Sequence, residues 1–317
     1  MKIKELWNKI RKGVKAGMAA ATESNVLTDN RVVSMIEKFK ASGKYELMKE
    51  GERYYQADND IKNRKITRKV DGHKEEETWR ANNKLAHAKY KIQVDEKIAY
   101  LLTKPVTYKT DGADKNDTYV EKVKDVLGKH FQYQLTQLGY EASNKGIGWL
   151  HVYLDPEGEL KTIVIPAEQC IPYWSDRSHT ELDAMIRVYN TTVWQYNQEK
   201  EITNVEIWTK DGVKYYRLEG QMLVYDNDKS MDAGGPVAHY KSVEEWKTWG
   251  KVPFIPFKNN QIEMPDIKFV KSLIDGYDLG RSEAANYMDE VKNLIFVLKG
   301  YGGQNLSDFI KQLNEDR

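Results

Sequence analysis

A helical pattern of about thirty residues, starting at Pro265, constrains the fold of this chain more than any other feature of its sequence. Apolar side chains recur there at spacings of three and four, which predicts one broad apolar side on a single helix. They are Ile267, Val270, Ile274, Tyr277, Ala284, Ala285, Met288, Val291 and Ile295, with Gly276 and Gly280 interrupting the series. Pro265 suits the first turn, and thirty residues span roughly 45 Å. Because no further domain follows before Arg317, we expect this helix to find few packing partners within the chain.

Four shorter helices are predicted in the first half of the chain. Apolar residues at helical spacing mark them at about 31–41, 44–55, 84–103 and 116–139. Asp29 or Asn30 would cap the first, and Asn82-Asn83 would cap the third. The highly charged stretch 56–80 lies between the second and third of these helices. With Asp71-Gly72 as a turn signal, it predicts an exposed arm or long loop.

The middle of the chain changes to the period of β-strands. Gly146-Ile147-Gly148 opens the first of these, and Asp155-Pro156-Glu157-Gly158 and Asp211-Gly212 read as turns. We predict strands at about 149–154, 160–165, 169–173, 182–189, 203–209, 213–219 and 252–257. The fold class is therefore α+β, with a helical N-terminal half around a β-rich middle, followed by the long helix.

The charge and cysteine counts narrow the function. The 49 basic and 48 acidic residues nearly cancel, which argues against a protein that grips nucleic acid along a broad basic surface. Cys170 is the single cysteine, so no intrachain disulfide can form, and we expect it to be a small buried residue. No run reaches the roughly 18 apolar residues of a membrane span.

Residues 2–18 form a separate amphipathic pattern. Apolar residues from Ile3 to Met18 lie at helical spacing, and lysines and Arg11 occupy the remaining face. Such a helix binds a membrane surface or a partner, or it docks on its own domain or a neighbouring subunit. We favour docking.

The sequence contains no known catalytic motif. Phosphate-binding loops, dinucleotide fingerprints, zinc-protease helices and serine-hydrolase elbows are all missing. The six histidines are scattered, and His151 falls in a predicted strand as a core or interface residue. Asp275 and Asp278 form a conceivable carboxylate pair for a metal, but the polar face of a long helix explains them better. We therefore predict no enzyme, no catalytic residue, no metal and no cofactor.

Several segments, taken in order, resemble one known family. They are Tyr54-Tyr55, the stretch from Asn82-Asn83 through His87, Val94 through Pro105, Gly146 through Leu150, Pro253 through Asn260, and Asp266 through Gly300. This order is similar to that of portal proteins of siphophages that infect Gram-positive hosts. The match covers about residues 45–300, and Thr103 stands where the family often has glycine.

The resemblance implies a domain plan. Residues 1–25 would be an amphipathic N-terminal segment, 26–262 the wing, 263–299 a stem helix and 300–317 the start of the clip. The rest of the clip, a second stem helix, a tunnel loop and a crown would be missing, so we expect a truncated portal protein.

The resemblance also implies a function without chemistry in this chain. The protein would be a subunit of a dodecameric ring at the capsid portal vertex of the virion, made in the host bacterial cytoplasm, through which double-stranded DNA passes non-specifically. Its partners would be the large terminase subunit, the major capsid and scaffolding proteins and head-completion proteins, with no membrane. Six residues of the long helix would face the channel or a subunit interface, namely Lys268, Lys271, Asp275, Asp278, Arg281 and Glu283.

Two alternatives stay open. A metal-dependent nucleic-acid enzyme would use Asp275, Asp278 and a third carboxylate, and its DNA cleavage would be lost in Asp278→Ala. A membrane-associated scaffold would use the helix at 2–18, and liposome binding would be lost when residues 1–20 are deleted.

Overall fold

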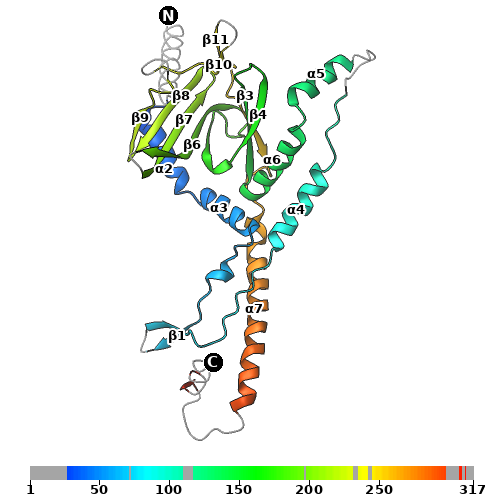
Figure 1. Ribbon diagram of the computed structural model, residues 1–317, viewed down its shortest axis with the longest axis vertical. Coiled ribbons are helices and arrows are strands. Elements are labelled where there is room, and N and C mark those ends of the chain that lie inside the picture. The colour runs from blue at the N-terminus through cyan, green and yellow to red at the C-terminus, as the bar shows by residue number, and fades with distance from the viewer. Residues whose placement is uncertain are drawn as a thin grey trace, which may run out of the picture. The chain divides into compact units, whose positions relative to one another are not determined.

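The computed structural model describes residues 27–70, 73–109, 117–195, 198–230, 235–241 and 245–297, together with 307, 308 and 311. The predicted helix at 2–18 lies outside these residues, as do 300–303 and most of 306–313. The chain divides into two units, each built from two separate stretches (Figure 1). Unit 1 comprises Met1–Ser42 and Gln169–Pro253, and unit 2 comprises Gly43–Glu168 and Phe254–Arg317. The assignment of 26–262 to one wing domain stays a prediction.

Unit 1 is a five-stranded antiparallel sheet with helix α2 (Asp29–Lys40) packed on one face. Its strands follow chain order and are β5 (Cys170–Trp174), β6 (Leu182–Gln195), β7 (Gln198–Thr209), β8 (Gly212–Glu219) and β9 (Met222–Tyr225). Alternate residues of β6 and β7, such as Ile186 and Val205, point toward Val32 and Ile36 of α2. A short two-stranded pair, β10 (Tyr240–Lys241) and β11 (Trp246–Lys247), completes the described part of this unit.

Two predictions for unit 1 need correction. The residue that caps α2 is Thr28 and not Asp29 or Asn30, and it makes no side-chain cap bond. Asp29 instead lies in the first turn, where its charge suits the positive end of the helix dipole. The β6–β7 hairpin is also longer than predicted, because its ladder continues to the pair Gln195↔Gln198. Cys170 is buried, as predicted.

Unit 2 combines helices with a three-stranded antiparallel sheet in the order β12-β3-β4. The strands are β3 (Ile147–Leu154), β4 (Leu160–Ile165) and β12 (Phe254–Lys258). The helices are α3 (Gly43–Tyr55), α4 (Lys89–Leu102), α5 (Asp117–Leu127), α6 (Phe131–Lys145) and α7 (Ile267–Val297), with 3-10 turns at Asp60–Asn63 and Ala167–Gln169. His151 is buried in β3, as predicted. The observed elements confirm the α+β class.

The predicted helix at 116–139 is in fact two helices, α5 and α6. They are separated at Gly128, whose φ of 71° lies in the left-handed region that glycine adopts without strain. Helix α6 then continues to Lys145 and ends at Gly146, whose φ is 87°. A Cβ at Gly146 would lie 2.3 Å from the backbone oxygen of Glu263, so only glycine fits there.

The arm between α3 and α4 contains an antiparallel hairpin that was not predicted. Its strands are β1 (Thr67–Val70), labelled in Figure 1, and β2 (His73–Glu76), and they pair with Val70 opposite His73. The side chains of β2 are all exposed. The predicted start of the next helix at residue 84 is wrong, because α4 begins at Lys89 and the preceding residues run along α7.

Helix α7 has 31 residues and runs through both Gly276 and Gly280. This confirms the long helix, but the expectation of few partners is wrong. Ile267 and Ile274 are buried in one core with Tyr54 of α3 and Tyr90, Val94 and Ile98 of α4. The long helix therefore belongs to the core of unit 2.

Candidate functional site

One side of α7 carries a buried polar stripe. Asp278 and Ser282 are 0% exposed and Asn286 is 3% exposed. Because these residues are four apart, they lie on one side of the helix. Polar side chains buried to this extent need hydrogen-bond partners.

The partners are backbone amides of residues 83–87, here called the arm segment. The Asn83 N–H donates to Asn286 Oδ1 (2.6 Å), the Leu85 N–H to Ser282 Oγ (3.0 Å) and the His87 N–H to Asp278 Oδ1 (3.2 Å). Four helical residues rise about 6 Å, and two extended residues advance about 6.6 Å. The two spacings nearly match, so every second arm residue meets every fourth residue of α7. These bonds explain why residues 84–88 are not helical.

Asp278 is the most heavily bonded member of the stripe. Its Oδ2 accepts a hydrogen bond from Asn59 Nδ2 (2.5 Å), and its Oδ1 also lies 3.0 Å from His87 Nδ1. Asn59 is itself 0% exposed and donates to the His87 carbonyl (3.0 Å). The buried carboxylate thus joins three separate parts of unit 2, and this dense bonding offsets the cost of burying it.

A charged cluster surrounds Lys271, about two turns before Asp278. Lys271 Nζ contacts Asp60 Oδ2 (2.5 Å) and Asp275 Oδ2 (2.7 Å), and Tyr54 Oη donates to Asp275 Oδ1 (2.5 Å). Burial alone would raise the pKa of Asp60, but hydrogen bonds from Lys271 and Arg53 lower this pKa to about 2. Burial and the bond to Asp275 raise the pKa of Tyr54 to about 12.

The residue before α7, Asp266, fixes where the helix begins. Its carboxylate accepts hydrogen bonds from Lys97 of α4 (2.6 Å), from Asn259 after β12 (2.8 Å) and from the Ser143 hydroxyl of α6. Its N–H donates to the Ser143 carbonyl (2.9 Å). The start of α7 is thereby anchored to three other elements.

The opposite side of α7 is apolar and exposed. Phe269, Leu273, Tyr287 and Met288 are 58%, 73%, 69% and 66% exposed. At 3.6 residues per turn Phe269, Leu273 and Tyr287 lie on the side of the helix away from Asp278, and Met288 lies at the edge of that side. Gly276 and Gly280 lie among them, and a Cβ at either position would meet only open space. We call these six residues the apolar face of α7.

The structure distributes the six predicted interface or channel residues between two environments. Lys271, Asp275, Asp278 and Glu283 are bonded within unit 2, Glu283 to Arg64. Lys268 and Arg281 are exposed. Whether any of the six faces a channel or a neighbouring subunit stays a prediction.

Sequence reasoning missed Ser282, Asn286 and Asn59. A signal for the first two was present, because Asp278, Ser282 and Asn286 place polar groups at a spacing of four along the helix. Asn59 had no such signal, since its partners lie far away in the sequence.

The carboxylates of α7 are occupied by protein donors. Asp275 bonds Tyr54 and Lys271, whereas Asp278 bonds Asn59 and His87. Among the described residues, no group of three or more His, Cys, Asp or Glu side chains is arranged to hold a metal ion. Within the same residues, no helix is long and apolar enough to cross a bilayer.

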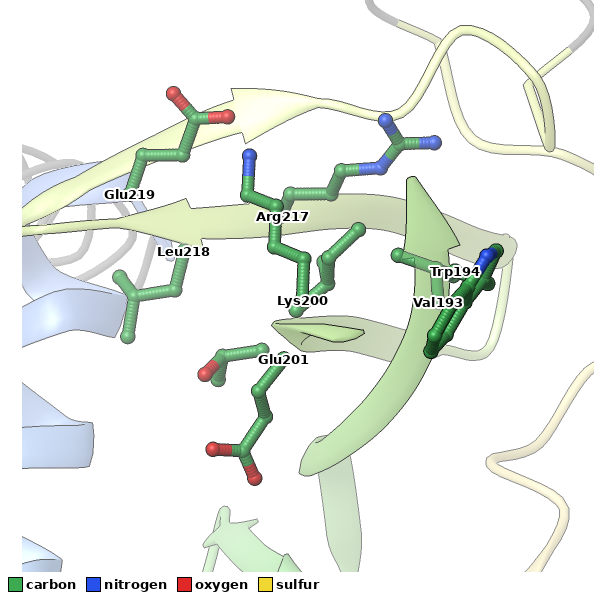
Figure 2. A pocket seen from close by; sticks show the side chains of 9 residues that line it. Val193, Trp194, Lys200, Glu201, Arg217, Leu218 and Glu219 are labelled. Carbon is green, nitrogen blue, oxygen red and sulfur yellow. The ribbon is translucent and has the colours of Figure 1, made fainter. Parts of the chain in front are cut away.

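Unit 1 carries an open groove where the β6–β7 hairpin extends beyond β8. Figure 2 shows its lining, with Trp194 from β6, Lys200 from β7, and Arg217 and Glu219 from β8. The Arg217 guanidinium bonds Asp226 and Asp228, each at 2.9 Å. This groove is a surface of mixed charge and no catalytic set converges in it, so α7 is the stronger candidate site.

Comparisons with known proteins all find similarity to phage portal proteins. The model of a family described as "Phage portal protein, SPP1 Gp6-like" matches residues 41–316. The portal protein of Bacillus phage SPP1 is 33% identical over 282 residues, which cover 88% of this chain and 54% of that protein. The portal protein of Clostridium phage phiCD119 is 32% identical over 270 residues, which cover 82% of this chain and 56% of that protein. The chain thus spans about half the length of these curated relatives.

Proposed function

We propose that this chain, which belongs to the SPP1 Gp6-like family of phage portal proteins, acts as a subunit of a ring at the portal vertex of a phage capsid. Double-stranded DNA would pass through the ring during packaging and ejection. The proposed role is structural, with α7 as a stem helix and residues 26–262 as the wing.

The apolar face of α7 is the observation that carries this proposal. A helix that buries one side within its own unit and exposes Phe269, Leu273 and Tyr287 on the other is suited to a second packing partner. In a ring this partner is the neighbouring subunit, because head-to-tail interfaces close around an axis. Gly276 and Gly280 would allow the two helices to approach closely.

Charged residues of α7 would then line the passage or flank the interface. Of the six predicted residues, Lys268 and Arg281 are exposed, whereas Lys271, Asp275 and Asp278 stabilise the helix from within unit 2. We therefore assign a channel or interface role first to Lys268, Arg281 and the half-exposed Glu283. Mixed charge suits DNA that must slide, since each strong phosphate contact adds affinity.

The partners follow from the same proposal. A large terminase subunit would dock on the ring and hydrolyse ATP, and major capsid, scaffolding and head-completion proteins would contact it in the virion. The balanced charge of the chain, 49 basic against 48 acidic residues, supports a conduit and not a tight DNA-binding surface.

The decisive test is ring assembly of the Leu273→Asp variant, followed by mass photometry and negative-stain microscopy. We expect wild-type protein to form large species with a central hole, and Leu273→Asp to shift the mass distribution to small species, because a charge in an apolar interface is costly. Met222→Asp on β9 is the matched control, since Met222 is 70% exposed against 73% for Leu273. Equal assembly by Leu273→Asp and Met222→Asp would contradict the role of α7.

A further inference from the structure

The β1–β2 hairpin has two open edges. It forms a two-stranded sheet, and no other strand among the described residues pairs with it. A lone hairpin of four-residue strands is marginally stable in water. Its backbone groups are therefore available to another strand.

The register identifies the backbone groups that point outward. The Glu77 N–H donates to the Ile66 carbonyl (2.8 Å), so these two residues form a hydrogen-bonded pair. Such pairs alternate along an antiparallel ladder, which makes Arg68↔Glu75 and Val70↔His73 bonded pairs too. The N–H and C=O groups of Thr67 and Lys69 consequently point away from the hairpin on the β1 edge, and those of Lys74 and Glu76 on the β2 edge.

The two edges carry opposite charge. Lys65, Arg68 and Lys69 lie on or just before β1, whereas Glu75, Glu76 and Glu77 lie on or just after β2, with Lys74 as the exception. Lysines on an edge usually prevent pairing with other strands. Here the segregation of charge disfavours β1 against β1 and β2 against β2, and favours β2 against β1 of another copy.

The hairpin is also held in place on α7. Arg64 before β1 bonds Glu283, and Arg80 after β2 bonds Glu290 at 3.1 Å. Both ends of the hairpin are thus tied to the helix that also carries the proposed subunit interface, and Tyr287 of the apolar face lies beside Arg64 and Arg80. Copies in a ring are related by rotation, so a neighbouring β1 runs in nearly the same direction as the first β1, and antiparallel to β2.

We propose that the acidic β2 edge of each subunit pairs with the basic β1 edge of the next copy of this chain, so that the hairpins form a continuous sheet around the ring. This inference rests on the proposed ring. The pairing is head-to-tail, and it gives the ring a contact that is independent of the apolar face of α7.

Charge reversal in trans tests the pairing. Arg68→Glu with Lys69→Glu makes both edges acidic, and Glu75→Lys with Glu76→Lys makes both edges basic. Each double variant alone should lower the apparent association constant between subunits about tenfold, as like charges then meet at every interface. An equimolar mixture should restore assembly, because acidic and basic copies alternate, and native mass spectrometry should show rings of equal composition.

The mixture separates contacts between subunits from contacts within one hairpin. Arg68→Glu removes the internal ion pair Arg68–Glu77 (3.8 Å), Glu76→Lys removes the internal ion pair Lys65–Glu76 (3.0 Å), and mixing the variants repairs neither. Failure of the mixture to assemble would overturn the pairing. If wild-type protein forms rings and each double variant assembles equally well, the pairing is wrong and the proposed ring still stands. Wild-type protein that stays monomeric would overturn both proposals.

A backbone test completes the design. Both Lys69→Pro and Lys69→Ala remove the lysine charge. Lys69→Pro also removes the outward backbone N–H, whereas Lys69→Ala keeps this N–H. We expect Lys69→Pro to assemble more weakly than Lys69→Ala, and equal assembly would contradict strand pairing at this edge. Circular dichroism and hydrogen exchange of both variants would show whether the hairpin itself remains folded.

Discussion

Helix α2 in unit 1 and the arm segment in unit 2 both dock on a larger element, but different forces hold them. Helix α2 meets its sheet through apolar side chains, with Val32 and Ile36 against Ile186 and Val205. The arm segment meets α7 through backbone N–H groups that donate to Asp278, Ser282 and Asn286. One contact is made by surface burial and the other by directed bonds.

The apolar contact of α2 mainly contributes stability, whereas the hydrogen bonds of the arm segment mainly fix its position along α7. Apolar burial is non-directional and roughly proportional to area, so α2 gains stability without needing one exact alignment. Hydrogen bonds weaken steeply when misaligned, so the arm segment is fixed to one position along α7. This places the β1–β2 hairpin, which lies between the anchors Arg64 and Arg80, at a defined height on the helix.

The largest effect is expected from the apolar contact. Ile186 is 0% exposed, and Ile186→Ala should lower the free energy of unfolding by about 2–5 kcal/mol through lost burial and a cavity. Urea denaturation followed by tryptophan fluorescence measures it. Ile186→Val is the mild control, expected at about 0.5–1.5 kcal/mol. A similar loss in both variants would show that the contact depends on exact fit and would break the comparison.

A smaller but more local effect is expected from the hydrogen-bonded contact. Asp278→Ala leaves the His87 N–H without its acceptor and leaves the buried Asn59 amide with only the His87 carbonyl, at a cost of about 1–3 kcal/mol. Amide hydrogen exchange should accelerate at residues 83–87 and not in the sheet of unit 1. Asp278→Asn keeps one acceptor oxygen and should fall between wild type and Asp278→Ala. Uniform acceleration across the chain would contradict a local role.

The smallest effect concerns the charged cluster next to the stripe. Because the pKa of Asp60 is lowered to about 2, its contribution to stability is complete above its unfolded pKa of about 3.9 and is lost as the pH falls through about 2. Lys271→Met should raise this pKa and shift the loss to higher pH, as followed by carboxyl carbon NMR titration. Lys62→Met, which removes only a contact to Asp58 (3.5 Å), should leave the Asp60 titration unchanged.

Sequence patterns predicted elements well where the spacing of apolar residues repeats regularly along the element. The strands β3 and β4, the helix α3 and the long helix α7 all lie close to their predicted bounds. The family resemblance is likewise confirmed by membership in the SPP1 Gp6-like portal family. The missed break at Gly128 did have a local signal, a glycine between two apolar runs.

The start of α4 was mispredicted for a different reason. Asn82-Asn83 followed by apolar residues is a normal helix start, yet residues 84–88 are not helical. Their amides bond side chains about 200 positions later in the chain. No local pattern reports such a partner, so this non-helical conformation becomes favourable only once α7 is in place.

The amino-acid sequence by itself determined the α+β class, the long helix and the portal family, because periodicity and motif order are properties of neighbouring residues. Tertiary structure alone decided which side of α7 is buried. Both sides of that helix carry apolar and polar groups. Ile267 and Ile274 are buried against α3 and α4, and further along the helix the amides of the arm segment bond Asp278, Ser282 and Asn286. A buried backbone N–H without an acceptor is costly, and this cost selects the polar stripe for the inside and leaves the apolar face exposed.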